Sequence, residues 1–343
     1  MGTAFSLPAT FSLPCCGPRN TTWPDAEGDA VSTPPAPLKV PARAAGDSLL
    51  DLASPTRRTA QPPAPRKADS FEDRYRVLTK LGQLGGGAFS TVHFCEQRRT
   101  PDGTRVEKRM RIRLVAKVND KRRLPPQLVE YREIELHRAA RHDNIVTLHD
   151  AFEDLKTATL VLEFCPGGEL FDTILVEKRR WADGMAFRDT DAAVACRHIL
   201  RALEFLHASD VAHRDVKAEN VLLSRTGVPL ADNIFKLCDL GFAATCPAGG
   251  LFGPWGSEDT IAPEALRPPH RHGLAGDLWS LGVVAYMTLA GKIPFTSKEM
   301  IMGGHYNTLV GATAQARDFF EALLVQEEER PTAAEALRAQ WLQ

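Results

Sequence analysis

One short stretch of the chain carries polar side chains that could act together on a phosphate ester. Between two apolar runs lie His213, Arg214, Asp215, Lys217 and Asn220. Asp215 could accept a proton, Lys217 could neutralise phosphate charge, and Asn220 could hold a metal ion. The stretch therefore has the residue types needed for proton transfer and for electrostatic stabilisation of a charged group.

A second acidic motif comes nineteen residues after Asn220. It is Asp239-Leu-Gly241, and it directly follows the strand-like apolar run 234–238. A carboxamide and a carboxylate on neighbouring loops suit Mg²⁺, which prefers oxygen ligands and binds through substrate phosphates. The sequence therefore predicts that Asn220 and Asp239 hold Mg²⁺.

Together, the two motifs resemble the catalytic loop and the metal-binding motif of eukaryotic protein kinases. A His-Arg-Asp tripeptide alone would more simply be a hydrated turn after a helix, but Asn220 and Asp239 at this spacing argue against that. The resemblance implies that Asp215 orients the acceptor hydroxyl and takes its proton, while Lys217 stabilises the transferring phosphoryl group. A lysine two positions after the aspartate, here Lys217, resembles the serine/threonine class of protein kinases.

The bulk composition excludes several other classes of protein. The 343 residues are 43% hydrophobic and 25% charged with a net charge of −1, which is ordinary for a globular protein and predicts no nucleic-acid partner. The cysteines show no paired metal-binding spacing, so we expect reduced thiols in a cytoplasmic protein. The apolar run 278–290 is too short to span a membrane and is typical of a buried helix.

Residues 1–70 differ from the rest because prolines crowd them and no periodicity is present. We expect a disordered tail, since it cannot bury enough apolar surface to offset the entropy of ordering. Gly2 fits a myristoylation pattern, and Cys15 and Cys16 could carry palmitoyl chains for peripheral membrane association. The alternatives are a chance match and an organelle transit peptide, which the low Arg content disfavours.

The folded domain is expected over 71–343, and it begins with a strand from Tyr75 to Leu84. The glycine-rich segment that follows would let backbone amides approach a phosphate. Relative to the family, a small Ser replaces the third glycine. The resemblance implies a phosphate-binding loop made of Gly85, Gly86, Gly87, Ser90 and Val92. The basic segment 93–113, with the turn Pro101-Asp-Gly103, then predicts a hairpin.

Lys117 near the end of the apolar strand 113–118 is unusual, because a buried ammonium needs a partner. The resemblance implies that it contacts the α- and β-phosphates of ATP. Val115 stands where the family has a smaller residue, which would narrow the adenine pocket. The alternative is that the strand is aligned with the family one residue out of register.

In the family, a glutamate on the next helix pairs with this lysine. The predicted helix 127–142 offers Glu130, Glu133 and Glu135. The spacing to His142-Asp-Asn-Ile-Val, which resembles a family motif, favours Glu133. This helix is similar to that of polo-like kinases.

The buried-type strand 159–165 resembles the hinge between kinase lobes. The resemblance implies that Leu162 is the gatekeeper, that Glu163 and Cys165 offer backbone contacts to adenine, and that Leu222 packs beneath it. The following Gly-Gly-Glu-Leu-Phe-Asp resembles the calcium/calmodulin-dependent kinases. Its Glu169 is expected at the pocket mouth near ribose and basic substrate residues, or else is a helix N-terminal acid.

The segment 246–256, where many kinases are phosphorylated, contains no hydroxyl group. We therefore expect a kinase that needs no phosphate there, with Phe252 and Trp255 packing the loop instead. Ser257 and Thr260 stand where the family has Thr and Tyr. Asp277 is expected to anchor the catalytic loop, unless it is an N-cap.

The sequence predicts an α+β, bilobal protein-kinase-like fold with a small β-rich lobe at 71–162 and a larger helical lobe at 166–343. We expect an enzyme that uses ATP and Mg²⁺ to phosphorylate Ser or Thr in protein substrates. Two alternatives remain open. A pseudokinase scaffold would bind partners with little catalysis, and a small-molecule kinase could share the fold.

Overall fold

The computed structural model describes residues 70–87, 89–107, 113–124, 132–180, 184–253 and 256–343. Apart from Ser70, the tail with Gly2, Cys15 and Cys16 lies outside these ranges, so its disorder and lipidation stay predictions. Within the same ranges, no helix is both long and apolar enough to cross a membrane.

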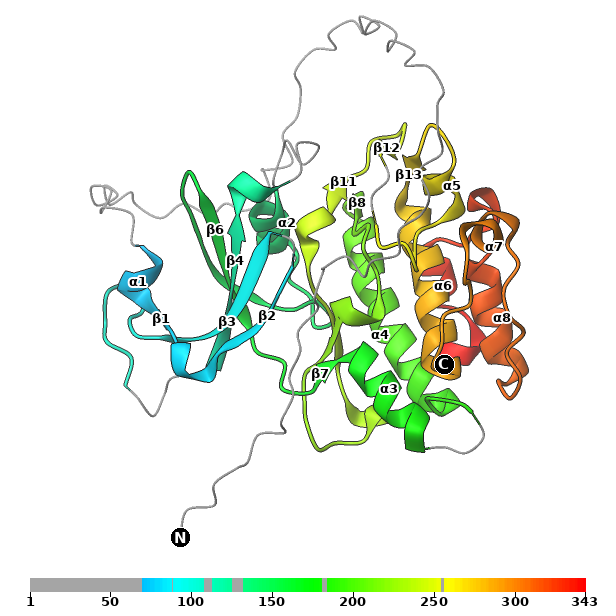
Figure 1. Ribbon diagram of the computed structural model, residues 1–343, viewed down its shortest axis with the longest axis horizontal. Helices are drawn as coiled ribbons and strands as arrows, with labels where there is room; N and C mark the ends of the chain where they lie inside the picture. The colour runs from blue at the N-terminus through cyan, green and yellow to red at the C-terminus, as the bar shows by residue number, and fades with distance from the viewer. Residues whose placement is uncertain (1–69, 88, 108–112, 125–131, 181–183, 254–255) are drawn as a thin grey trace, which may run out of the picture. The chain divides into compact units, whose positions relative to one another are not determined.

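An antiparallel sheet forms the N-terminal lobe (Figure 1). Its strands run in the order β1-β3-β4-β6-β5, and β2 also pairs with β3. Two short helices accompany the sheet, α1 (Phe71–Arg74) and α2 (Glu133–Ala139). The strands are β1 (Tyr75–Val77), β2 (Gln83–Gly86), β3 (Ser90–Gln97), β4 (Arg113–Asp120), β5 (Leu148–Glu153) and β6 (Thr157–Glu163).

The expected continuous strand from Tyr75 to Leu84 is wrong. A 3₁₀ turn at Thr79–Leu81 separates β1 from β2, although both pair with β3. Val77 lies opposite Cys95 and Gln83 opposite His93, so the chain between them must loop out of the sheet. Gly82 returns the chain at φ 75°, a conformation that favours glycine.

Two further expectations for this lobe hold in part. The segment 93–113 is a hairpin of β3 and β4, with a further bridge between Arg99 and Arg105, although 108–112 lie outside the described residues. Of the helix expected over 127–142, 127–131 lie outside the described residues, α2 covers Glu133–Ala139, and the expected end at 142 is wrong because the helix stops at its C-cap, Ala140.

The C-terminal lobe is mainly helical. Its helices are α3 (Leu170–Arg180), α4 (Asp189–His207), α5 (Pro263–Leu266), α6 (Leu274–Ala290), α7 (Lys298–Gly303), α8 (Ala314–Leu323) and α9 (Ala333–Ala336). Short strands connect them at β7 (Gly168–Glu169), β8 (Val211–Ala212), β9 (Val221–Leu223), β10 (Phe235–Leu237), β11 (Ala244–Thr245), β12 (Leu251–Phe252) and β13 (Arg271–His272). Three of these form the sheet β10-β9-β7, while β11 pairs with β8 and β12 with β13.

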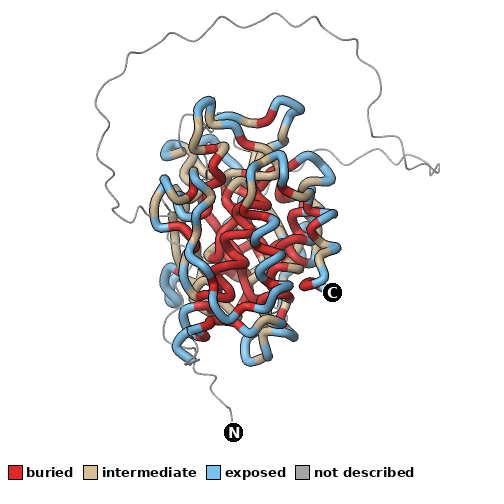
Figure 2. Tube along the Cα trace, turned by 90° about the vertical axis from the view of Figure 1, so that its right-hand side faces the viewer, coloured by how far each residue is buried: buried red, intermediate tan, exposed pale blue. Residues whose placement is uncertain are grey.

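The core of this lobe is organised around α6, and Figure 2 shows the buried trace running through its centre. Every residue from Asp277 to Ala290 is buried, which is the behaviour of a helix enclosed on all sides. The apolar face of α4 is buried as well, at Ala195, Ile199, Ala202, Leu203 and Leu206.

Gly282 lets α8 approach α6 closely. A Cβ atom built at Gly282 would lie 2.9 Å from Leu323 Cβ and 2.9 Å from Leu324 Cδ2. We expect Gly282→Ala to lower the free energy of unfolding by about 1–3 kcal/mol, the usual cost of overpacking, even though alanine favours a helix.

Gly276→Ala in the same helix is the matched control. The nearest atom to its added Cβ would be Glu264 Oε1 at 3.9 Å, so its unfolding free energy should stay the same or rise by up to about 1 kcal/mol. Urea denaturation of both variants measures the difference. Equal stabilities would contradict the close approach of the two helices.

Candidate active site

The polar loop after β8 folds into a network centred on the Asp215 carboxylate. Ser257 Oγ donates to Asp215 Oδ1 at 2.7 Å, and Lys217 Nζ lies 2.9 Å from Asp215 Oδ2. Lys217 Nζ also donates to Ser257 Oγ at 2.8 Å, which closes a three-residue ring. The Asn220 amide donates to Asp215 Oδ2 at 2.8 Å, so the carboxylate is fixed from several sides.

Asp277 at the start of α6 explains why this loop keeps its shape. Its carboxylate accepts the backbone N–H groups of His213 and Arg214, each at 2.8 Å, and lies 2.9 Å from His207 Nε2. Burial would raise the pKa of Asp277, but its hydrogen bond with His207, together with charge and backbone contacts there, holds the pKa below its ordinary value. The N-cap of α6 is Gly273, so the N-cap interpretation of Asp277 is wrong.

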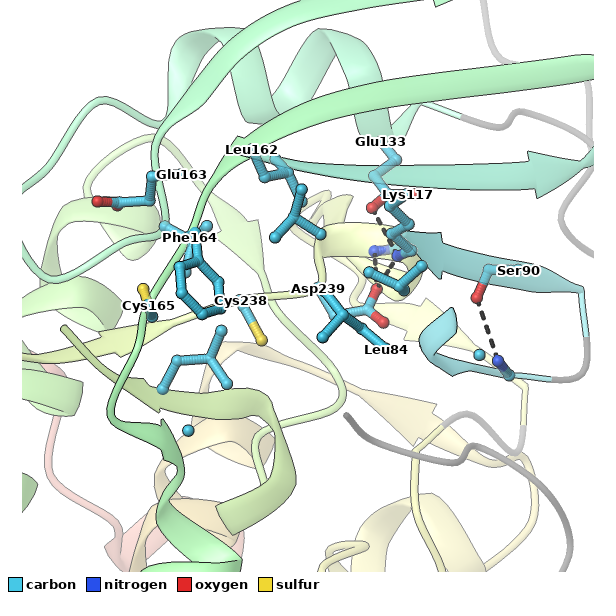
Figure 3. A pocket seen from close by; sticks show the side chains of 18 of the residues that line it. Leu84, Ser90, Lys117, Glu133, Leu162, Glu163, Phe164, Cys165, Cys238 and Asp239 are labelled. Carbon is cyan, nitrogen blue, oxygen red and sulfur yellow. Dashed lines mark hydrogen bonds and ion pairs between the residues drawn. The ribbon is translucent and has the colours of Figure 1, made fainter. Parts of the chain in front are cut away.

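Lys117 on β4 meets two carboxylates (Figure 3). Its Nζ donates to Glu133 Oε1 at 2.8 Å and to Asp239 Oδ1 at 2.7 Å. Glu133 is 2% exposed at the start of α2, whereas Glu135 is exposed and pairs with Arg132. Glu130 lies outside the described residues. The structure therefore brings Glu133, rather than Glu135, to the lysine.

The electrostatics of this triad favour the charged forms of Lys117 and Asp239. Burial by itself would lower the pKa of Lys117, but Asp239 and Glu133 raise it above its ordinary value. Burial would raise the pKa of Asp239, but Lys117 and the Gly241 amide lower it from 3.8 to about 2. The stability that this carboxylate contributes is therefore present above pH 3.8 and is lost as the pH falls towards 2.

The two side chains predicted to bind Mg²⁺, one carboxamide and one carboxylate, lie on adjacent elements. Asn220 ends a 3₁₀ turn before β9, and Asp239 follows β10, which pairs with β9. Asn220 Oδ1 is buried and has no hydrogen-bond partner in the part of the chain that the structure describes. An oxygen left without a donor fits a metal ligand, because a buried unpaired acceptor is costly.

An apolar pocket opens beside the triad, and Figure 3 shows side chains that line it. Most of the predicted nucleotide-binding residues line it, namely Gly86, Gly87, Ser90, Val92, Val115, Lys117, Glu133, Leu162, Glu163, Cys165, Leu222 and Asp239. Sequence reasoning missed others, namely Leu84, Phe89, Val146, Phe164, Gly168, Asp172, Cys238, Gly241 and Phe242. Most of these flank a predicted residue, so adjacency was the available signal.

Two predicted residues do not line the pocket. Gly85 comes just before the glycines that line the pocket. Glu169 is buried, with 4% of its surface exposed, in strand β7, which pairs with β9. Burial, followed by the neighbouring charges of Asp172 and Glu219, raises the pKa of Glu169 to about 8. Asp172 lines the pocket in its place.

The register of β4 decides which side chains face the pocket. Val115 lies opposite Phe94 and Leu162 in the sheet, and both Val115 and Lys117 line the pocket. Ala116 packs in a separate cluster. Because side chains alternate between the two faces of a strand, a register shifted by one residue is excluded. Val115 therefore faces the pocket and narrows it.

The glycine-rich loop is closed by its own hydrogen bonds. The amide of Gly87 donates to the carbonyl of Ser90 at 2.9 Å and lies 3.3 Å from Ser90 Oγ. At the tip, Phe89 packs edge-on against Phe242, with ring centroids 6.3 Å apart. The serine that replaces the family's third glycine therefore adds a side-chain hydrogen bond to a turn that the backbone already closes.

The segment after Asp239 corrects one expectation. Phe252 is 58% exposed and does not pack the loop, and Trp255 lies outside the described residues. Pairing of β12 with β13 holds this part of the chain instead. Further on, Thr260 is buried, and Arg330 forms an ion pair with Glu264 at 2.7 Å.

Lys117→Met should leave the buried carboxylate of Glu133 and the half-buried carboxylate of Asp239 without their cation. We expect the free energy of unfolding at neutral pH to fall by about 3–5 kcal/mol, the cost of breaking a buried ion pair. One of the two carboxylates would then hold a proton in the folded state. Folding would bind protons, so the deficit should shrink as the pH falls.

Urea denaturation at several pH values measures this dependence. Lys121→Met is the control, because Lys121 pairs with Glu153 at the surface and its loss should be small and independent of pH in that range. A constant deficit for Lys117→Met would contradict the shared-cation arrangement.

Comparisons with known proteins agree with this geometry. A model of the protein kinase domain matches residues 78–342. A calcium and calcium/calmodulin-dependent serine/threonine-protein kinase of Lotus japonicus is 37% identical over 218 residues, which is 59% of this chain and 39% of that protein. Calcium/calmodulin-dependent protein kinase type 1 of Macrobrachium nipponense is 32% identical over 289 residues, which is 80% of this chain and 77% of that protein.

A longer relative matches over most of this chain. Myosin light chain kinase 3 of Rattus norvegicus is 30% identical over 303 residues, which is 83% of this chain and 36% of that protein. The chain therefore spans less than half of the length of the Lotus and rat proteins. Since the kinase-domain model covers most of the residues and the triad, loop and pocket occur together, the chain belongs to the protein kinase domain family.

Proposed function

We propose that this protein is a serine/threonine protein kinase that transfers the γ-phosphoryl group of ATP to hydroxyl groups of protein substrates. The observation that carries the proposal is the fixed Asp215 carboxylate, which lies in one network with Lys217 and Ser257. Phosphoryl transfer needs little covalent chemistry from the protein, so a precisely positioned base and cations supply most of the catalysis.

Each residue of the network has a separate role in this proposal. Asp215 accepts the proton of the substrate hydroxyl, and Lys217 stabilises negative charge on the transferring group. Lys117, held by Glu133, binds the α- and β-phosphates. Mg²⁺, when bound by Asn220 and Asp239, neutralises charge on the phosphate oxygens.

The pocket walls suit an adenine ring. Apolar side chains of both lobes face it, among them Leu84, Val92, Val115 and Leu222. The hinge backbone between Glu163 and Cys165 offers hydrogen bonds along one edge. The Glu163 side chain is itself held by Lys236 at 2.7 Å, which keeps the hinge in place.

Two observations support a serine or threonine acceptor in a protein. Lys217 occupies the position typical of this type of kinase, and the relatives compared above are named serine/threonine or calmodulin-dependent kinases. Asp172 and Glu219, which both lie near Glu169 and are half-buried, further favour a basic substrate residue, because a cation there would offset their negative charge. The pseudokinase alternative has no comparable support. Ser257, which stands where the family has threonine, still makes the hydrogen bonds that join its segment to Asp215 and Lys217.

Asp239→Asn should reduce phosphoryl transfer by more than about a hundredfold, because a metal ion contributes several kcal/mol of charge stabilisation and an amide binds Mg²⁺ more weakly. The fold should survive, since Lys117 keeps Glu133. Autophosphorylation and thermal unfolding are measured together. Asp232→Asn, at an exposed position, is the control. Activity within a few-fold of the wild type would refute the metal-ligand role.

Activity should not depend on a phosphate in the activation segment. Residues 246–256 contain no hydroxyl group, and Arg214 already donates through Nε to the carbonyl of Phe242. Phosphatase treatment, checked by mass spectrometry of the loop peptide, should leave the rate unchanged. The exposed Thr245 is the nearest alternative acceptor. An inactive but folded Thr245→Ala variant, with stoichiometric phosphate on wild-type Thr245, would contradict this.

A further inference from the structure

A buried asparagine, Asn119, lies beside Lys117 and belongs to none of the motifs that resemble the kinase family. Asn119 follows Lys117 by two positions on β4 and is 1% exposed. Residues two apart on a strand share one face of the sheet. The register places Asn119 between Ser90 of β3 and Ala158 of β6, so it lies in an interior strand.

The amide of Asn119 contacts the second oxygen of the glutamate that pairs with the lysine. Asn119 Nδ2 donates to Glu133 Oε2 at 3.3 Å, while Lys117 Nζ donates to Glu133 Oε1 at 2.8 Å. Both carboxylate oxygens are thus bonded from the same strand. Because Glu133 begins α2, these bonds fix the start of the helix against the sheet.

The lysine alone is an incomplete anchor for Glu133, because its ammonium also bonds Asp239 Oδ1 at 2.7 Å. A nucleotide phosphate would be a third anion for the same cation. The neutral amide of Asn119 would not be drawn to that phosphate as the ammonium is, so its bond to Glu133 would persist if the lysine turned towards the phosphate.

We propose that Asn119 is a positioning residue that holds Glu133, and through it Lys117, in the arrangement needed for phosphoryl transfer. The inference rests on the proposed kinase function. The substitution Asn119→Leu distinguishes a hydrogen-bonding role from packing, because leucine has nearly the same size as asparagine but no hydrogen-bond donor.

A double-mutant cycle tests the bond directly. Asn119→Leu should lower kcat by about tenfold, the order expected for a hydrogen bond to a charged group, with the KM for the peptide substrate unchanged. Glu133→Gln should also lower kcat. If the two residues act as one unit, Asn119→Leu combined with Glu133→Gln should be little worse than Glu133→Gln alone.

Asn233→Leu is the matched control for losing a buried asparagine. Asn233 is 4% exposed and bonds the backbone of Arg225, in a loop that follows β9. It should lower the melting temperature and leave kcat per folded molecule unchanged. The proposal is overturned if Asn119→Leu keeps wild-type kcat, or if its effect is fully additive with that of Glu133→Gln.

Asn119→Asp supplies a readout that a packing role would not give. The new carboxylate would face Glu133, so repulsion should suppress activity at pH 8, and a shared proton should restore it as the pH falls towards 6. The ratio of variant to wild-type kcat should therefore rise on acidification. In the background of Glu133→Gln, where the repulsion is absent, the ratio should be flat. A flat ratio in both backgrounds overturns the proposal.

The same double-mutant cycle can be measured by nucleotide binding and thermal stability in place of kcat. These measurements separate failure of this inference from failure of the proposed function. Affinity for a fluorescent ATP analogue and the melting temperature are measured for all four proteins of the cycle. If no protein phosphorylates any peptide but the two residues remain coupled in binding, the kinase proposal fails and the Asn119–Glu133 contact stands. Additive effects on binding and melting overturn the positioning role.

Discussion

A single buried ammonium group links the parts of the molecule that must cooperate. Lys117 comes from the sheet, Glu133 from α2, and Asp239 from the turn after β10. Burial of these charges would be unfavourable for each alone, and only their mutual contact makes it tolerable. The positions of the sheet, the helix and the turn are therefore coupled, since displacing any of them leaves an unpaired charge in the interior.

The C-terminal lobe supplies the rigid support for this arrangement. Helix α6 is enclosed by other elements, and its Asp277 reaches the backbone of the catalytic loop. Arg214 and Asp239 both adopt positive φ, at 66° and 62°. Such conformations are costly for residues with side chains and persist where surrounding contacts determine them, which is common at functional sites.

The ring of Asp215, Lys217 and Ser257 shows how a departure from the family pattern can preserve chemistry. Serine retains the hydroxyl that links carboxylate and ammonium, and only a methyl group of the family's threonine is missing. A similar economy occurs at Ser90, whose hydroxyl lies near the Gly87 amide in the glycine-rich loop. The first substitution keeps a hydroxyl group in place, and the second adds one.

The sequence by itself determined the family, the two-lobe fold and most of the pocket residues, because catalytic side chains must occur as particular types at particular spacings. Lys117, Asp215, Asn220 and Asp239 could be named for that reason. The apolar run 278–290 also predicted the buried α6, since a helix enclosed on all sides must be apolar all round.

The tertiary structure decided what depends on neighbours distant in the chain. The break between β1 and β2 follows from their shared pairing with β3, and the burial of Glu169 accompanies the pairing of β7 with β9. Phe252 is exposed because β-pairing, and not aromatic packing, orders its segment. The contact of Asn119 with Glu133 likewise joins a strand to a helix. Local sequence carries no record of such partners, because the contact exists only once both elements are packed.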